Sequence, residues 1–272
     1  MRIIDISGFG HSGKTAVSDL LREFKNYDVS HPNFEFNLLR IQGGLLDLKN
    51  GLVDNWSPIR SDASIRRFKK LIKKIGPKAS IFSPKTLFYS NGMNYDSFFN
   101  EKFSKISLKY IDSLYDYKYK GEWPYISLDE SIIYLFIKRI INYIFRIKIK
   151  HSIYVTSGDD FILKTKNYLD ELFINFSEKK SENIVLHNAF EPFNSIVSAN
   201  FFKKSKSIVV IRDPRDIYCS TLMKNENIFQ PDFDLNDHHS KLKKDFLHSE
   251  NINNFIKRQK IILKKFNPVN NK

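Results

Sequence analysis

The sequence predicts an α/β fold with a central, mostly parallel sheet, and three observations lead to this expectation. The chain opens with a short apolar run, Ile3-Ile4-Asp5-Ile6, followed by a glycine-rich turn and then a helical pattern, as in the first unit of an α/β domain. Two β-branched runs, residues 183–186 and 207–211, lie near the other end and have the composition of buried parallel strands. Helical periodicity fills most of the chain between them.

The first helix is expected directly after the glycine turn. Its apolar residues fall on one helical face: Ala16, Val17, Leu20, Leu21 and Phe24. Further helices are expected at 61–75, at 95–117, from a Ser127-Leu128-Asp129-Glu130 capping box to about residue 146, at 161–176 and from about Pro214. With 272 residues we expect one domain, 1–272, in three layers, whose middle at roughly 40–180 forms a large helical insertion.

The composition is that of a globular protein with a strongly basic surface. Lys and Arg number 44 against 30 Asp and Glu, a formal net charge of +14, which favours an anionic partner: a nucleotide, an anionic glycan, nucleic acid or an anionic membrane. The single cysteine, Cys219, excludes an intramolecular disulfide. The first residues lack the apolar segment of a signal peptide, and the most apolar stretch, 131–149, is interrupted by charges. We therefore expect a cytoplasmic protein that can touch an anionic membrane peripherally without crossing it.

The first motif that carries chemistry is Gly8-Phe9-Gly10-His11-Ser12-Gly13-Lys14-Thr15, which fits the pattern G-x-x-x-x-G-K-[ST]. It follows an expected strand and opens an expected helix, which is the context of a phosphate-binding P-loop. Glycines let backbone N–H groups converge on an anion, and the helix N-terminus adds its positive dipole. Lys14 would place a cation on a terminal phosphate or sulfate, and Thr15 would donate from its hydroxyl. The pattern predicts a nucleotide site without saying which nucleotide.

The second motif begins where the strand at 207–211 ends, at Arg212-Asp213-Pro214-Arg215-Asp216. Proteins that hydrolyse ATP or GTP need an acidic Mg²⁺ ligand at such a strand end, whereas this strand ends in a cation. Ser220 follows Arg212 by eight residues, about two turns into the next helix. A guanidinium and a hydroxyl suit a phosphate dianion without a metal, so this segment predicts a second phosphate site.

Together the two motifs resemble those of sulfotransferases, which transfer a sulfuryl group from 3′-phosphoadenosine 5′-phosphosulfate (PAPS) to an acceptor hydroxyl and have a P-loop-type fold. The resemblance implies that Arg212 and Ser220 hold the 3′-phosphate, and that Lys14 stabilises the oxygen that leaves, with no metal. The 5′-phosphosulfate would lie on the loop residues Gly10, His11, Ser12, Gly13, Lys14, Thr15 and Ala16. The acceptor implied by the resemblance is a carbohydrate or a glycolipid.

The chain departs from the family pattern in two places. His11 stands where the family usually has a cation, and Lys14 where it has the first of two hydroxyls, which makes the loop more like that of a P-loop kinase. The family usually has a further C-terminal region that contacts the nucleotide, and 60 residues follow Arg212, so we expect a shortened member. Two alternatives stay open: a P-loop kinase or other enzyme that uses ATP or GTP, and a non-catalytic nucleotide-binding protein with a degenerate fold of this kind.

Transfer requires a base that takes the proton of the acceptor hydroxyl. In carbohydrate-modifying sulfotransferases a Glu near paired aromatics often follows the P-loop by a little over twenty residues, and here Glu35 lies between Phe34 and Phe36. The alternative base is His187, which ends the strand expected at 183–186. Two polar residues close behind it are candidate helpers: Asn188 and Glu191.

Other charged clusters carry weaker signals. Acidic and histidine side chains gather without the spacing of a metal site, so no metal is expected there: Asp232, Asp234, Asp237, His238 and His239. The helix expected at 61–75 has a basic face, typical of a solvated surface and also suited to an anionic glycan or lipid headgroup: Arg66, Arg67, Lys69, Lys70, Lys73 and Lys74. No specific nucleic-acid partner is expected. The sequence leaves open the acceptor, the choice of base and the oligomeric state.

Overall fold

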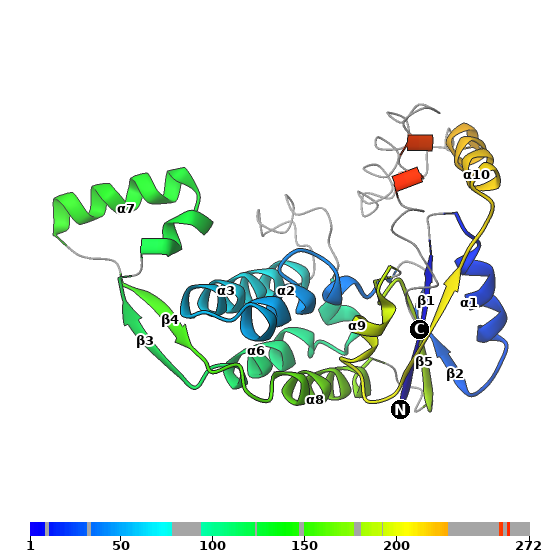
Figure 1. Ribbon diagram of the computed structural model, residues 1–272, viewed down its shortest axis with the longest axis horizontal. Helices are drawn as coiled ribbons and strands as arrows, with labels where there is room; N and C mark the ends of the chain where they lie inside the picture. The colour runs from blue at the N-terminus through cyan, green and yellow to red at the C-terminus, as the bar shows by residue number, and fades with distance from the viewer. Residues whose placement is uncertain are drawn as a thin grey trace.

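In the computed structural model the described residues are 1–8, 11–31, 34–77, 94–122, 124–146, 150–176, 181–191, 193–227, 256–257 and 260–261. Four strands form one parallel sheet in the order β2–β5–β1–β6 (Figure 1). Their bounds are Arg2–Gly8 for β1, Tyr27–Val29 for β2, Asn183–His187 for β5 and Ser205–Val210 for β6. The predicted α/β class, the parallel sheet and the strands near both ends of the chain are confirmed.

The register of the sheet brings three strand ends together. Ile6 of β1 lies opposite His187 of β5, and Gly8 of β1 lies opposite Val210 of β6. From β1 the chain passes to β2 on one side, and after β5 it crosses β1 to reach β6 on the other side. In open α/β sheets a ligand binds beyond the carboxyl ends of the strands at such a reversal. The carboxyl end of β1 is therefore the expected position of a site.

Helix α1 (Lys14–Arg22) covers one face of the sheet. Its residues Val17 and Leu21 pack on a small apolar cluster of the two central strands, which comprises Ile4, Ile6 and Val185. The helical face predicted from the sequence is wrong in part, because other apolar residues of that set are exposed: Ala16, Leu20 and Phe24. The small cluster is covered by one stripe of the helix, through Val17, the fully buried Ser18 and Leu21.

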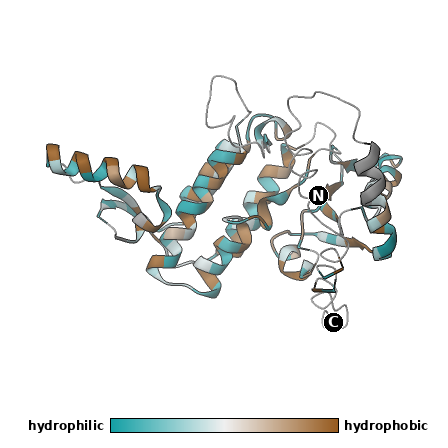
Figure 2. Ribbon diagram, turned by 90° about the horizontal axis from the view of Figure 1, so that it is seen from above, coloured by the Kyte–Doolittle hydropathy of each residue, from teal (hydrophilic) through white to brown (hydrophobic). Residues whose placement is uncertain are grey.

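The other face of the sheet carries a helical body, in which apolar stripes of the helices face inward (Figures 1 and 2). Its elements are α2 (Leu45–Lys49), a π-helical turn (Asn50–Asp54), α3 (Pro58–Ile75), α5 (Tyr95–Phe98), α6 (Phe103–Ser113), α8 (Phe161–Ile174) and α9 (Ser195–Ala199). One contiguous apolar core joins this body to Ile3 of β1 and to Ile184 and Leu186 of β5. The chain leaves the sheet after β2 and returns at β5, which pairs directly with β2.

Two of the expected helices of this body are confirmed. Helix α3 begins after Ser57, whose hydroxyl accepts from the Arg60 N–H at 3.2 Å, and its apolar spacing is buried as predicted: Ile65, Phe68, Ile72 and Ile75. Helix α8 matches the expectation for 161–176. Regular spacing of three and four predicted both helices because each buries one long face.

Two expectations around residue 100 and residue 130 are wrong. Asn100 and Glu101 adopt left-handed φ values (51° and 58°), which separate α5 from α6, so residues 95–117 do not form a single helix. The expected capping box is displaced, because residues 124–129 form a 3₁₀ helix, η3 (Pro124–Asp129). Helix α7 (Ile132–Phe145) is capped instead by Ser131, whose hydroxyl accepts from the Tyr134 N–H at 3.2 Å.

An antiparallel hairpin that the sequence did not predict extends from the helical body. Its strands are β3 (Tyr117–Gly121) and β4 (His151–Val155), and it carries α7 at its far end, away from the sheet (Figure 1). At the opposite end of the molecule α10 (Pro214–Asn227) follows β6, as predicted. No helix in the described part of the chain has both the length and the apolar composition needed to cross a membrane.

Candidate functional site

The loop between β1 and α1 has the backbone geometry of an anion-binding turn. Gly13, at the N-cap of α1, has a φ of 96°, a left-handed conformation that glycine adopts without strain. Among the described residues no side chain caps α1, and the Ala16 N–H donates to the Gly13 carbonyl at 3.1 Å, so an anion could still bind at the first turn of the helix. Thr15 and Ala16 in that turn are exposed. The predicted strand, loop and helix are present, while Phe9 and Gly10 lie outside the described residues.

Ser12 gives the clearest sign of a ligand at this loop. Its side chain is 4% exposed, and its buried Oγ has no hydrogen-bond partner among the described residues. A buried hydroxyl in that state costs roughly 1–3 kcal/mol unless a ligand or ordered water completes it. Gly8 provides the space, because a Cβ there would lie 2.9 Å from Ser12 Oγ and 2.4 Å from the carbonyl oxygen of Val210.

A chain of hydrogen bonds joins three residues that are far apart in the sequence. Lys14 folds back over the loop, and its Nζ donates to the Gly8 carbonyl at 3.1 Å and to Asn188 Oδ1 at 2.6 Å. Asn188 Nδ2 in turn donates to Glu35 Oε1 at 2.8 Å. Asn188 is 6% exposed and has a left-handed φ of 50°, which Asn tolerates better than most residues. The predicted cation and one predicted base therefore lie on either side of one buried amide.

Glu35 is aimed at the loop by the buried residues beside it. Phe34 and Phe36 are both in the core, while Glu35 between them is half-buried. The hydroxyl of Tyr95 donates to the Glu35 carbonyl at 3.0 Å and accepts from the Asn37 N–H at 2.9 Å. Burial raises the pKa of Tyr95, so its hydroxyl stays protonated and continues to donate. Alternating core and polar positions thus turn one carboxylate toward the strand ends.

His187, the other predicted base, is differently placed. It ends β5 on the same side of the strand as Val185, which packs under α1, and it is 6% exposed. Its Nε2 is buried and forms no hydrogen bond within the described ranges. Burial lowers the pKa of His187, with Lys14 acting in the same direction and Glu35 in the opposite one, so the ring is neutral at pH 7. It lies near the site electrostatically but is not part of the hydrogen-bonded chain.

Arg212 reaches the same loop from the neighbouring strand. Its Nη1 donates to the His11 carbonyl at 3.3 Å, and its Nε lies 3.7 Å from Asp216 Oδ2. The guanidinium stays partly exposed, at 41% of the side chain. Ser220 is half-buried on α10, and among the described residues it makes no hydrogen bond to Arg212 or to the loop. The structure therefore brings Arg212 to the glycine loop and does not yet join Ser220 to it.

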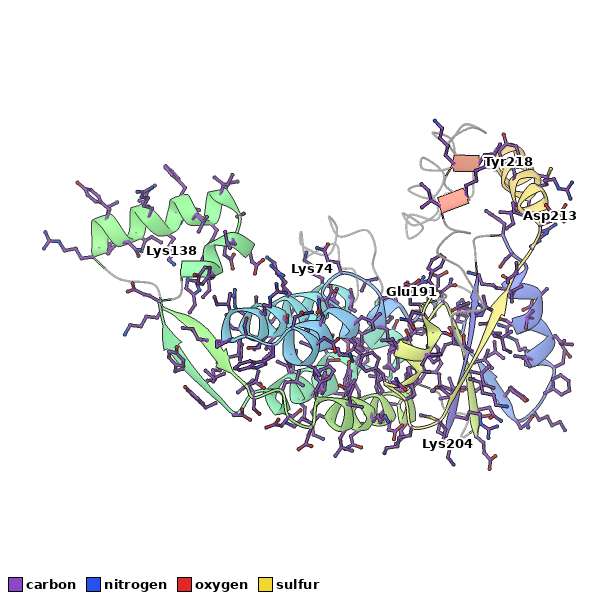
Figure 3. All side chains as sticks on the ribbon, in the orientation of Figure 1. Lys74, Lys138, Glu191, Lys204, Asp213 and Tyr218 are labelled. Atoms are coloured by element: carbon purple, nitrogen blue, oxygen red, sulfur yellow. The ribbon has the colours of Figure 1, made fainter. Side chains whose placement is uncertain are left out.

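The carboxylate of Asp213, next to Arg212 in the chain, already has a partner of its own. Asp213, where β6 gives way to α10 (Figure 3), accepts from Arg215, whose Nη2 lies 2.7 Å from Asp213 Oδ2. This pairing lowers the pKa of Asp213 to about 2. Among the described residues no three His, Cys, Asp or Glu side chains gather in a group that would hold a metal ion. The cluster at 232–239 lies outside the described residues.

Asp5 is a residue that the sequence analysis missed. It is fully buried on β1, and its carboxylate accepts from the Ala189 N–H at 2.8 Å, from the Ser207 hydroxyl at 3.3 Å and from Ser7. Burial raises the pKa of Asp5, against the effect of these donors. The carboxylate fixes the turn that contains Asn188. Its sequence signal is a single acidic residue inside an otherwise apolar strand.

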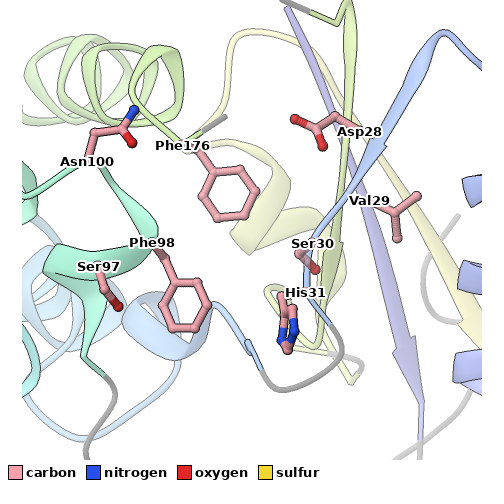
Figure 4. A pocket seen from close by; sticks show the side chains of 8 residues that line it. All are labelled: Asp28, Val29, Ser30, His31, Ser97, Phe98, Asn100 and Phe176. Atoms are coloured by element: carbon pink, nitrogen blue, oxygen red, sulfur yellow. The ribbon is translucent and has the colours of Figure 1, made fainter. Parts of the chain in front are cut away.

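A pocket of about 230 Å³ opens beside the segment that leads from β2 to Glu35 (Figure 4). One wall comes from the end of β2, and the other carries two aromatic rings, those of Phe98 and Phe176. In this wall Asp28 Oδ2 and Ser30 Oγ are buried, and no residue in the described part of the chain forms a hydrogen bond with either atom. Unpartnered polar oxygens beside aromatic faces suit a ligand that carries hydroxyl groups.

The basic face of α3 is partly engaged within the protein. Arg67 Nη2 lies 2.8 Å from Asp129 Oδ1, and Lys70 donates to the Asp129 carbonyl at 3.2 Å. Arg66 pairs with the buried Asp62 at 2.9 Å. The contacts with Asp129 attach η3 to α3, and Lys69 Nζ lies 3.4 Å from the Tyr154 hydroxyl, so at least four of the six cations have a structural partner.

No model of a protein family matches the chain, and searches of curated proteins and of solved structures find no match. The chemistry of the site therefore has to be inferred from its own residues.

Proposed function

We propose that this protein is a PAPS-dependent sulfotransferase with a P-loop-type three-layer fold, in which residues at roughly 40–180 form a helical insertion. The observation that supports this most is the 3.3 Å contact between Arg212 Nη1 and the His11 carbonyl. It holds a guanidinium beside a loop that is itself built for an anion. A donor with a 5′-phosphosulfate and a 3′-phosphate needs two neighbouring anion sites of this kind.

The loop has the donors that a phosphosulfate requires. Ser12 Oγ and N–H groups at the start of α1 would bind its oxygens, with Gly13, Lys14 and Ala16 forming the turn around them, and Thr15 would add a hydroxyl. Arg212 would bind the 3′-phosphate, joined by Ser220 once the nucleotide is present. His11 lies in the loop, where its carbonyl accepts from Arg212, and its backbone N–H would contact the donor.

The bonded chain through Asn188 gives the transfer step its base and its cation. Glu35 accepts the proton of the acceptor hydroxyl, whose oxygen forms a bond to sulfur. The bond between sulfur and the 5′-phosphate oxygen breaks, and its electron pair stays on that oxygen. Lys14 faces this developing charge and stabilises it. His187 is the alternative base, because its ring is neutral, but its 6% exposure makes it less accessible to an acceptor.

Charge at the strand ends favours a metal-independent reaction. The strands on either side of β1 lead into Asn188 and Arg212, and the carboxylate of Asp213 is paired with Arg215. Two cations, Lys14 and Arg212, are therefore the groups that would balance the charge of the donor.

The acceptor is proposed to be a carbohydrate or a glycolipid that enters by the pocket of Figure 4. The rings of Phe98 and Phe176 would stack on a sugar face, while Asp28 and Ser30 would bind its hydroxyls. The pocket adjoins the segment that carries Glu35, so an acceptor there has a short path to the base.

The test is calorimetric titration of the protein with adenosine 3′,5′-bisphosphate without metal, beside ADP, for the wild type and Arg212→Ala. Arg212→Ala removes charge-assisted hydrogen bonds worth roughly 1.5–3 kcal/mol, so it should weaken binding of the bisphosphate about 10- to 100-fold and binding of ADP much less. Arg215→Ala is the matched control. It also removes one positive charge, three residues after Arg212, but the Arg215 side chain is already paired with Asp213. Equal losses for both nucleotides, or equal effects of the two variants, would contradict the assignment of Arg212.

A P-loop kinase is the second candidate, favoured by the order Gly13-Lys14-Thr15 and by the exposed Thr15 at the start of α1. It requires binding of ATP that depends on Mg²⁺. Titration with ATP and Mg²⁺ in the same series distinguishes the two. Selective binding of Mg·ATP over the bisphosphate would replace the sulfotransferase proposal with this one.

A further inference from the structure

Helix α7 exposes an apolar surface along its whole length. None of its 14 residues is buried. Three of its largest apolar side chains, Ile132, Phe136 and Tyr143, are 84%, 64% and 88% exposed. The helix stands away from the helical body at the tip of the β3–β4 hairpin, and Figure 2 shows its apolar colouring along its length. A contiguous exposed patch of this kind indicates an interaction site.

Most of the exposed apolar residues lie on one side of the helix. Spaced by one, three and four, they form the apolar face of α7: Ile132, Ile133, Phe136, Ile137, Ile140, Tyr143 and Ile144. The half-buried residues recur on the opposite side: Tyr134, Leu135, Lys138, Ile141 and Asn142. On that side Lys138 Nζ lies 3.0 Å from His151 Nε2 of β4, which turns the helix toward the hairpin. The apolar face is therefore directed away from the protein.

Positive charge surrounds the apolar face. Residues 131–150 contain no Asp or Glu and five cations: Lys138, Arg139, Arg146, Lys148 and Lys150. On a helical projection Lys138 falls opposite the centre of the apolar face, and the exposed Arg139 lies at its edge. Two further lysines of the hairpin, Lys118 and Lys120, are exposed on β3. Large exposed apolar side chains with Lys and Arg at the edge and beyond the end of the helix are typical of a helix that lies in a membrane interface.

We infer that α7 docks the protein on an anionic lipid bilayer, with the apolar face at the boundary between headgroups and acyl chains and the cations among the headgroups. The helix is about 21 Å long, too short for a hydrocarbon core of about 30 Å, so it lies along the surface. A second copy of the chain is a poorer occupant. One helix face about 21 Å by 10 Å covers roughly 200 Å², whereas a stable interface buries about 800 Å² on each partner.

This assignment replaces the basic face of α3 as the lipid contact expected from the sequence. Arg66, Arg67 and Lys70 on that face contact Asp62 or Asp129. The α7 surface combines charge with exposed apolar area, and the α3 face offers charge alone. The inference is independent of the proposed sulfotransferase reaction.

The experiment is cosedimentation of the full chain with vesicles of phosphatidylcholine alone and of phosphatidylcholine mixed with phosphatidylglycerol. We expect binding to the anionic vesicles that falls as salt is added, and at least about tenfold weaker binding to the neutral ones. Replacing Phe136 and Ile140 together by Ser should weaken binding at least about tenfold. The matched control replaces two exposed apolar residues of α8, Leu163 and Ile174, by Ser and should leave binding unchanged.

Two outcomes would overturn the inference. One is absence of binding to anionic vesicles, and the other is a control pair that weakens binding as much as the α7 pair does. Light scattering of the same proteins tests whether a second copy of the chain binds the apolar face. If the wild type is a dimer that does not bind vesicles, and the double variant of Phe136 and Ile140 is a monomer, the face serves self-association instead. Should the α7 pair not fold, Tyr143→Trp provides the readout, because its fluorescence must be quenched by brominated lipid if α7 is inserted.

Discussion

Asn188 offers the sharpest test of the hydrogen-bonded chain at the site, through the variants Asn188→Gly and Asn188→Ala. Its amide joins Lys14 at 2.6 Å to Glu35 at 2.8 Å, and its backbone holds a left-handed φ of 50°. Both variants remove the amide. Gly keeps the backbone free to adopt that φ, whereas Ala does not. The pair therefore separates the side-chain bonds from the conformation of the turn.

The magnitudes follow from these two contributions. Hydrogen bonds to charged groups are worth roughly 1.5–3 kcal/mol each, and since Lys14 and Glu35 are only half-buried, water replaces part of the loss. We expect Asn188→Gly to lower the free energy of unfolding by about 2–3 kcal/mol. Ala in the left-handed conformation costs roughly 1–2 kcal/mol in the folded state. Gly has more conformational freedom in the unfolded chain, which destabilises the folded Gly variant by about 0.5–1 kcal/mol relative to Ala and offsets part of this difference. Asn188→Ala should thus be less stable than Asn188→Gly by about 0.5–1 kcal/mol.

Urea unfolding followed by circular dichroism measures both differences. A double-mutant cycle with Glu35→Ala then isolates the contact, with an expected interaction energy of about 1 kcal/mol. If Ala is as stable as Gly, the left-handed turn is wrong. If Asn188→Gly matches the wild type, or if the effects of Asn188→Gly and Glu35→Ala simply add, the bonded chain from Lys14 to Glu35 is wrong.

Three further outcomes test other parts of the structure. Burial lowers the pKa of His187 below 6.5, so as the pH falls the unfolded chain binds a proton at this imidazole before the folded chain does. The free energy of unfolding should be highest above about pH 6.5 and decrease below it. In urea titrations from about pH 7.5 to 5.5, His187→Gln should reduce this decrease. Phe36→Ala should lower the free energy of unfolding by about 3–5 kcal/mol, since the Phe36 ring is fully buried with its centroid 5.0 Å from that of Phe173. Phe24→Ala, at an exposed ring, should lower it by less than about 0.5 kcal/mol. Similar unfolding midpoints for the two variants would contradict this core. Gly158→Ala should destabilise more than Gly43→Ala in thermal unfolding, although both glycines are left-handed (φ 80° and 79°). A Cβ at 158 would clash with the Leu52 carbonyl oxygen at 2.1 Å, whereas at 43 the nearest backbone atom, Arg67 O, is 3.6 Å away. The reverse order of stability would refute the described turn.

The parts of the fold that were predicted are those that local patterns determine. The apolar run before Gly8 and the β-branched run at 183–186 form the buried strands β1 and β5, because buried parallel strands need no alternation. The run at 207–211 lies largely in a strand, β6, but the expectation that it is buried is wrong, because β6 is at the edge of the sheet and Ile208 is 39% exposed. Helix α3 followed from its spacing. Both anion motifs fell at one edge of the sheet because each follows a parallel strand, and parallel strands end on the same side.

The parts that were missed depend on contacts between distant residues. Nothing near Asn188 in the sequence indicates that its amide lies between Lys14 and Glu35, since that depends on the register of β5 against β1. Asp5 is similar, because its donors come from other segments of the chain. The apolar pattern of α7 suits a buried helix as well as an exposed one, and only tertiary structure distinguishes the two.

The two proposals are compatible with a single orientation of the molecule. In Figure 1 the strands of the sheet run upward, so the carboxyl edge that carries the loop, Arg212 and the start of α10 lies toward the top of the view. Helix α7 also lies toward the top, at the other end of the molecule, and its half-buried side faces down to the hairpin. A bilayer in contact with the apolar face of α7 would then lie on the same side of the molecule as the carboxyl edge of the sheet. That geometry favours, among hydroxyl-bearing acceptors, one anchored in the membrane, because such an acceptor would approach the loop from the side of the strand ends.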